Sequence, residues 1–199
     1  METDNPSRSA PAPDASARPM LNIVGTKVAF GPTRKDLLSL YVKWMNDFEL
    51  RLLLGDPVRP SSVKQISELI DKLIDDQSRC SFVLYELATL RPIGWIGLNG
   101  IDLTSRMASF VISIGEADCR GLGYGTEATR LMLDYAFGTL GLLSVRLEVH
   151  GFNERAIRAY QKAGFRPAGR WRQAYSQGGK AFDVLCMDCL ASEHAARGQ

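Results

Sequence analysis

A glycine-rich segment at residues 119–127, Cys-Arg-Gly-Leu-Gly-Tyr-Gly-Thr-Glu, constrains the fold of this chain more than any other feature. It follows an alternating run at 107–114 that predicts a strand, and it opens a run at 123–137 whose apolar spacing predicts a helix. Glycines let a backbone approach a ligand closely, and exposed amides at a helix start suit phosphate oxygens. The segment predicts a pyrophosphate site, and the alternative is a glycine-rich connection without a ligand.

The remaining pattern predicts one α/β domain over residues 21–192. A strand at 22–30 precedes a helix capped by Thr33, a second helix, and strands at 81–87, 92–99 and 107–114. These three strands lie too close together for crossovers and form an antiparallel meander. The helix at 123–137 leads to a strand at 143–150 by a parallel crossover. Asn153 caps a short helix that Gly164 ends, and strands follow at 165–172 and 181–190.

Composition excludes several classes of protein. Residues 1–20 hold four of the nine prolines and few large apolar groups, so we expect a flexible tail without a secretion signal. A net charge of +2 does not favour nucleic acid, and no apolar run approaches the ~18 residues of a membrane helix. Four irregularly spaced cysteines favour a reducing cytoplasm over a disulfide scaffold.

No metal site is expected. Cys186 and Cys189 form a C-x-x-C on a predicted strand, where residues three apart point to opposite faces, and the chain has only two histidines. Seven basic side chains and two acids lie between residues 146 and 172, which favours either an anion contact or a solvated surface.

Two linked motifs carry a resemblance to a known family. The first is Arg120-x-x-Gly123-x-Gly125, and the second is Asn153-x-x-Ala156-x-x-x-Tyr160-x-x-x-Gly164-Phe165. Together they resemble the pyrophosphate and second signatures of the GCN5-related N-acetyltransferases (GNAT). The sequence around residues 123–128 is most similar to the branch of ribosomal-protein-alanine and spermidine N-acetyltransferases.

This resemblance implies a fold and a set of binding residues. The implied fold is a mixed, mostly antiparallel sheet of about seven strands flanked by about four helices, with splayed parallel strands in the middle. The pantetheine arm of acetyl-CoA would pair with the strand before the glycine-rich segment, whose amides would hold the pyrophosphate. The implied acetyl-CoA contacts are Ile112, Ser113, Ile114, Arg120, Gly121, Leu122, Gly123, Tyr124, Gly125, Thr126, Asn153 and Tyr160.

The resemblance also gives Tyr160 the role of protonating the departing coenzyme A sulfur. A phenol with a pKa of ~10 is a suitable acid for a thiolate, although a core tyrosine is the alternative. Glu148 lies on the polar face of its strand, twelve residues before Tyr160, and the resemblance to ribosomal-protein alanine acetyltransferases, where a proposed base has this spacing, makes it the candidate general base. The alternative for Glu148 is an ion pair with Arg146 or with a neighbouring strand. Many relatives carry an acid just before Phe110, where this chain has Ala108 and Ser109, so His150 and water stay open as bases.

The expected activity is acetyl transfer from acetyl-CoA to a primary amine by direct attack, without a nucleic-acid or membrane partner. Protein N-termini, polyamines and aminoglycoside-like molecules remain open as acceptors, and a homo-oligomer is open. Residues 47–86 hold eight acids and five basic residues, a mild bias suited to a cationic amine. The alternative function is a non-catalytic acetyl-CoA-binding sensor or scaffold with the same fold.

Overall fold

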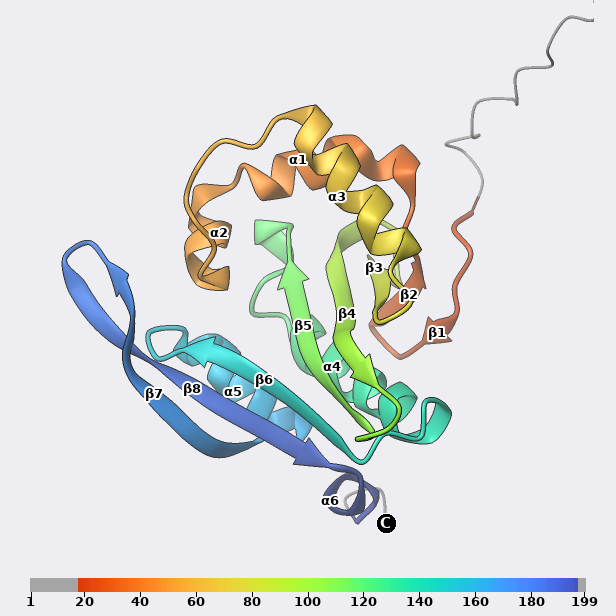
Figure 1. Ribbon diagram of the computed structural model, residues 1–199. Helices are drawn as coiled ribbons and strands as arrows, with labels where there is room; N and C mark the ends of the chain where they lie inside the picture. Colours follow the sequence, from red (N-terminus) through yellow and green to blue (C-terminus); the bar gives the residue numbers. More distant parts are fainter. Residues whose placement is uncertain (1–17, 197–199) are drawn as a thin grey trace, which may run out of the picture.

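A computed structural model describes residues 18–196, which fold around one eight-stranded sheet in the order β1-β2-β3-β4-β5-β6-β8-β7 (Figure 1). The strands are β1 (Ile23–Val24), β2 (Val28–Pro32), β3 (Cys80–Glu86), β4 (Pro92–Asp102), β5 (Met107–Ile114), β6 (Ser144–His150), β7 (Arg166–Gln177) and β8 (Lys180–Leu190). The helices are α1 (Leu38–Met45), α2 (Phe48–Leu54), α3 (Val63–Asp75), α4 (Tyr124–Asp134), α5 (Glu154–Ala163) and α6 (Ala191–Ala195).

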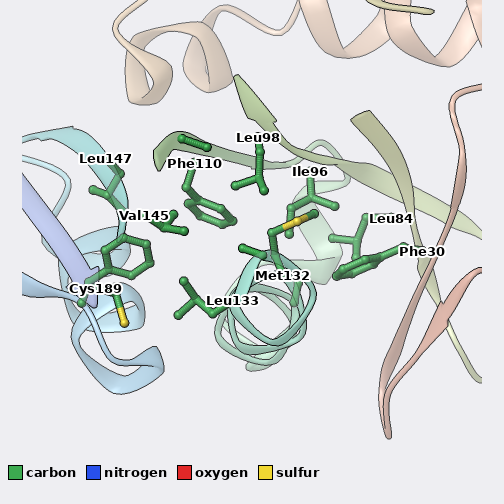
Figure 2. Packing of buried hydrophobic residues seen from close by; sticks show 14 of the residues in the cluster. Phe30, Leu84, Ile96, Leu98, Phe110, Met132, Leu133, Val145, Leu147 and Cys189 are labelled. Carbon is green, nitrogen blue, oxygen red and sulfur yellow. The ribbon is translucent and has the colours of Figure 1, made fainter. Parts of the chain in front are cut away.

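Two apolar clusters cover opposite faces of the sheet. Along β3, Leu84 packs into a cluster with α4, whereas its neighbours Val83 and Tyr85 pack into a cluster with α1 and α3. In the α4 cluster, Phe110 of β5 and Val145 of β6 lie near side chains of α4 (Figure 2). The sheet is therefore covered on both sides at β3, in the middle of the molecule, whereas β6 is buried on its α4 side and exposed at Arg146 and Glu148 on the other.

The central strands β5 and β6 are parallel, as the strand-helix-strand order predicted, and they pair only at one end. Residues Met107 to Ser109 are in register with Ser144 to Arg146, and no further pairing is recorded between these two strands. Beyond this short ladder the strands diverge (Figure 1). The splayed pair in the middle of a mostly antiparallel sheet confirms the expected fold.

The meander β3-β4-β5 and the antiparallel hairpin β7-β8 are also confirmed. At the second signature, Asn153 Oδ1 accepts from the Ala156 amide at 3.2 Å, and Gly164 ends α5, as predicted. The glycine-rich helix begins at Tyr124, with Gly123 as its N-cap, and continues beyond Asp134 as a π-helical turn.

Four details differ from the sequence expectations. The first strand is a hairpin, β1-β2, because the chain turns between Gly25 and Val28. Thr33 is not a helix cap, since its hydroxyl donates to the Ser81 carbonyl at 2.9 Å. The helices α2 and α6 were not predicted. Of the tail expected over residues 1–20, residues 1–17 lie outside the described range. Within residues 18–196, no helix combines the length and apolarity needed to span a membrane.

Candidate active site

The divergence of β5 and β6 opens a cavity of about 330 Å³. Its walls come from five parts of the chain that are distant in sequence: α2, the end of β5, the glycine-rich segment, the end of β6, and α5. The predicted site residues that line it are Ile112, Ser113, Ile114, Arg120, Gly121, Gly123, Gly125, Thr126, Glu148, Asn153 and Tyr160. The other candidate base, His150, lines it as well.

Two predicted contacts, Leu122 and Tyr124, do not line this cavity. The Leu122 side chain is 52% exposed, and the Tyr124 hydroxyl donates to Glu86 Oε1 at 2.7 Å. The Leu122 side chain therefore lies at the surface, and the Tyr124 side chain attaches the glycine-rich segment to β3.

The backbone of the glycine-rich segment has the form that the sequence predicted. Gly121 and Gly123 have φ angles of 85° and 87°, in the left-handed region that favours glycine, and a Cβ at Gly121 or Gly125 would meet only open space. The α4 N-terminus then leaves amides without helical partners. The Thr126 amide already donates to the Gly123 carbonyl at 3.1 Å, so the amides before Thr126 are better placed for an anion.

The Arg120 side chain is engaged in hydrogen bonds within the protein rather than being free for an anion. Its Nε donates to the Ile114 carbonyl at 3.0 Å, and its Nη2 donates to the Gly115 carbonyl at 3.0 Å and to Asp47 Oδ2 at 3.1 Å. The side chain is only 8% exposed. Arg120 therefore joins the end of β5 to the residue that caps α2.

The edge of β5 presents peptide groups to the cavity. Successive residues of a strand direct their N–H and C=O groups to alternate edges. The Gly115 amide bonds to Ile93 of β4, whereas the Ile114 carbonyl bonds to Arg120 on the opposite edge. By this alternation, Ile112 directs its peptide groups toward β6, into the region where the two strands have separated.

Tyr160 lies on the α4 side of the sheet, against apolar rings. Its ring centroid is 6.0 Å from those of Phe110 and Phe165, with interplanar angles of 88° and 61°. Burial disfavours the phenolate and raises the pKa of Tyr160 to about 12. The Tyr160 hydroxyl is therefore protonated at neutral pH, which a proton donor requires.

Glu148 and Ser113 lie on the other side of the sheet. Leu147 and Val149 belong to the α4 cluster, so Glu148 between them points to the α1 side. Ser113 is in register with Trp95, which packs against Trp44 of α1, and so it faces the same side. Tyr160 and Glu148 thus reach the cavity from opposite faces of the sheet.

Glu148 is exposed and makes no hydrogen bond or ion pair within residues 18–196, so the alternative of an ion pair with Arg146 is not formed. Ser113 is 4% exposed, and its hydroxyl is a buried polar group without a partner in the described chain. The Glu148 carboxylate is therefore free to interact with a bound molecule, whereas the Ser113 hydroxyl is buried behind the cavity lining.

His150 is packed more tightly than Glu148. Its ring stacks on Phe152 and contacts Tyr175, with centroids 5.4 and 4.1 Å away. Burial lowers the pKa of His150, and the nearby Glu148 charge opposes this effect. The imidazole is therefore neutral at neutral pH, held in place by two rings.

The α2 wall of the cavity, with Leu50, Leu53 and Leu54, was not predicted. A sequence signal existed, because Asp47 is an N-cap residue and Gly55 ends the helix in a left-handed conformation. The support of the glycine-rich segment by Glu127 was also missed. Its Oε1 accepts from the Thr26 and Lys27 amides at 2.6 and 2.8 Å, across about one hundred residues of sequence that give no local signal.

Comparisons with known proteins agree with this geometry. An acetyltransferase (GNAT) domain model matches residues 30–166. Spermidine N(1)-acetyltransferase of Escherichia coli K12 is 33% identical over 171 residues, which cover 83% of this chain and 89% of the relative. Alpha/beta-tubulin-N-acetyltransferase 9 of Homo sapiens is 29% identical over 155 residues, 72% of this chain and 74% of the relative.

Among solved structures, spermidine N-acetyltransferase from Vibrio cholerae in complex with CoA and spermine superposes with a TM-score of 0.78 and 25% identity. The match covers 85% of this chain and 98% of that one. Since the domain model spans more than half of the sequence and the fold agrees, this chain belongs to the GNAT acetyltransferase family.

Proposed function

We propose that this protein transfers the acetyl group of acetyl-CoA to a primary amine by direct attack, without an acyl-enzyme. The observation that carries the proposal is the cavity between β5 and β6, onto which the glycine-rich segment, the free edge of β5, Tyr160 and Glu148 all converge. The N-acetyltransferase activities named for its relatives support the same reaction.

The residues around the cavity suit acetyl-CoA. Amides of residues 120–126 would bind the pyrophosphate, as the open space at Gly121 and Gly125 allows. The peptide groups of residues 112–114 would bind the pantetheine arm, with the Ile112 amide directed toward the thioester. Arg155 and Lys162 line the cavity from α5 and add positive charge for phosphate groups.

The chemistry follows from the placement of two groups on opposite faces of the sheet. The acceptor nitrogen attacks the thioester carbon from the α1 side, where Glu148, directly or through water, takes the proton of the ammonium. The C–S bond breaks, and the electron pair leaves on sulfur. Tyr160, protonated and on the α4 side, donates its proton to that thiolate, and the second proton that the nitrogen loses as the amide forms returns through water to the Tyr160 oxygen.

Several parts of the assignment stay predictions. These are a single domain over residues 21–192, a cytoplasmic location, a homo-oligomer, the absence of nucleic-acid and membrane partners, and the absence of a metal. The three acceptor classes are protein N-termini, polyamines and aminoglycoside-like molecules. The names of the relatives support a protein and a polyamine as acceptors, since one names tubulin and the other spermidine.

A thiol-release assay with acetyl-CoA and a panel of amines tests the proposal, with acetylated product identified by mass spectrometry. We expect turnover with wild type, and Tyr160→Phe should lower kcat by about 100-fold or more without weakening CoA binding. Tyr135→Phe is the matched control, because Tyr135 is a partly buried tyrosine that does not line the cavity.

Glu148→Gln should lower kcat at neutral pH, and Glu154→Gln, an exposed residue that does not line the cavity, should not. Tight CoA binding without turnover on any amine would contradict the proposal and favour the sensor or scaffold alternative.

A further inference from the structure

The helix α2 is fixed across the cavity at both ends. At its N-terminus, Asp47 caps the helix by accepting from the Leu50 amide at 3.1 Å and also accepts from Arg120 Nη2 at 3.1 Å. At its C-terminus, the Leu53 carbonyl accepts from Asn153 Nδ2 at 3.3 Å. Arg120 and Asn153 begin the two signature segments, so the same residues that shape the carrier site also hold α2 in place.

A third contact closes the end of α2 against β6. Gly55 follows the helix with a φ of 76°, and a Cβ placed there would lie 1.7 Å from Nε2 of His150. The His150 ring is in turn packed against Phe152 and Tyr175. The α2 wall is therefore a rigid part of the cavity, not a loose flap.

The side chains that α2 directs into this cavity are apolar. Leu50, Leu53 and Leu54 all line the cavity; Leu50 is buried in the α1 and α3 cluster, Leu54 is half-buried against it, and Leu53 is half-buried outside it. This wall lies on the α1 side of the sheet, the side to which Glu148 points. A molecule whose amine approaches Glu148 therefore meets a leucine surface next to that amine.

The charges of the side chains that line the cavity limit how many positively charged groups a well-bound acceptor can have. Glu148 is the one carboxylate among the cavity residues in the described part of the chain, and Arg120, Arg155 and Lys162 are basic. A polyamine carries several ammonium groups at neutral pH, since amine pKa values are ~10. One carboxylate can balance one of them, and desolvating the others beside leucines is unfavourable. A peptide N-terminus brings one ammonium, with a pKa of ~8.

We propose that the acceptor is the α-amine of a peptide chain whose first side chain is large and apolar, and that Leu53 and Leu54 select that side chain. The inference rests on the proposed acetyl transfer and narrows its acceptor. The α-amine lies by Glu148, the first side chain covers the leucines, and the rest of the peptide leaves through the open mouth of the cavity.

Peptides that differ only in their first residue test the inference with the full-length protein. We expect kcat/KM for peptides beginning with Met or Leu to exceed that for peptides beginning with Ser or Gly by about 10-fold or more, because each methylene in an apolar pocket contributes to discrimination. Spermidine should be a poorer substrate than the Met and Leu peptides. Spermidine turned over as well as these peptides would overturn the inference and leave acetyl transfer standing.

Leu53→Ser tests the selecting wall. We expect kcat/KM for the Leu peptide to fall about 10-fold while that for the Gly peptide stays unchanged, so that the preference for large first residues is lost. Leu52→Ser is the matched control, since Leu52 lies on the same helix but not on the cavity, and it should keep the preference. An equal loss on every peptide in Leu53→Ser would show a structural role and overturn the inference. Failure of every amine, with CoA bound, would overturn the acetyl-transfer proposal and this inference together.

Discussion

Tyr160 has an unusual environment for a surface helix, because its ring packs against the apolar rings of Phe110 and Phe165 while it lines the cavity. The pKa of about 12 that burial gives Tyr160 lies above that of a free phenol, so the proton-donating form persists to high pH. The group needed for leaving-thiolate protonation is therefore not lost at the ordinary pKa of tyrosine.

We predict that kcat at saturating amine does not fall between about pH 8 and about pH 10, because Tyr160 keeps its proton across this range. The measurement is a pH profile of kcat for wild type, with circular dichroism at each pH to confirm that the protein is folded. A decrease with an apparent pKa near ~10, absent from the residual activity of Tyr160→Phe, would contradict the assignment.

Ser113 supplies a second prediction at this scale. A buried hydroxyl without a partner is destabilising by about 1 to 3 kcal/mol relative to a satisfied one. We expect Ser113→Ala to raise the free energy of unfolding by about 1 kcal/mol without ligand, measured by urea denaturation. Ser109→Ala, on the same strand and face, is the control. Destabilisation by Ser113→Ala would show that its hydroxyl has a partner in the free protein.

At the residue scale, sequence reasoning located backbone roles better than side-chain roles. Gly121 and Gly123 were predictable because positive φ angles and close approach require glycine itself. The hydrogen bonds of the Arg120 side chain could not be predicted, because one of its partners, Asp47, lies 73 residues away and nothing local in the sequence joins the two residues. The roles of Tyr160 and Glu148 in proton transfer stay predictions.

Among the secondary-structure elements, α2 is a helix that the sequence pattern did not predict. Its seven residues are too few for a clear apolar periodicity, so no separate helix was predicted between the first two helices. The hairpin of β1 and β2 was missed for a related reason, since the turn at Thr26 and Lys27 lacks the usual turn residues and is held by Glu127 from α4. A tertiary contact holds the β1-β2 turn, whereas α2 has local capping signals at Asp47 and Gly55 in addition to its tertiary contacts.

At the scale of secondary-structure elements, a substitution at Gly55 that adds one methyl group should have a large effect on stability. Alanine there combines left-handed strain, about 1 to 2 kcal/mol, with a collision with His150. We expect Gly55→Ala to lower the free energy of unfolding by about 3 kcal/mol, measured by urea denaturation.

The control is Gly178→Ala, at a φ of 56° with nothing within 4 Å, which should lose only the strain term. Adding His150→Ala to Gly55→Ala should remove the collision, so the two substitutions together should cost less than the sum of the single variants. Equal losses at Gly55 and Gly178 would mean that the close approach to His150 does not constrain α2.

Across the whole molecule, three carboxylates join the N-terminal third of the chain to the surroundings of the glycine-rich segment. Asp47 accepts from Arg120, Glu116 accepts from Lys43 Nζ and from Trp44 Nε1, and Glu127 accepts from the turn between β1 and β2. Burial acts to raise the pKa of each, yet hydrogen bonds outweigh it and hold all three pKa values below their usual range. The β1-β2 turn, α1 and the start of α2 are thus held against the surroundings of the glycine-rich segment by ionised acids.

This arrangement predicts acid sensitivity. A carboxyl whose folded-state pKa is depressed contributes stability above its unfolded pKa, ~3.9 for Asp and ~4.3 for Glu, and that stability is lost as pH falls through the folded value. We expect the free energy of unfolding to fall steeply below about pH 4. Glu127→Gln should destabilise the protein by about 2 kcal/mol at neutral pH, because an amide replaces a carboxylate acceptor. The difference from wild type should shrink as pH falls through the lowered pKa of Glu127, because the wild-type carboxyl then becomes protonated too.

Urea denaturation of both proteins as a function of pH measures this convergence. The control is Glu154→Gln, at an exposed residue that pairs with Arg158, and its free energy of unfolding should stay within about 0.5 kcal/mol of wild type. A constant difference between Glu127→Gln and wild type at every pH would show that the ionised form of Glu127 does not hold the β1-β2 turn on α4. Because that turn also places Lys27 Nζ beside the Leu122 carbonyl, at 3.4 Å, CoA affinity should weaken in parallel with the lost stability if Glu127 supports the glycine-rich segment through the turn.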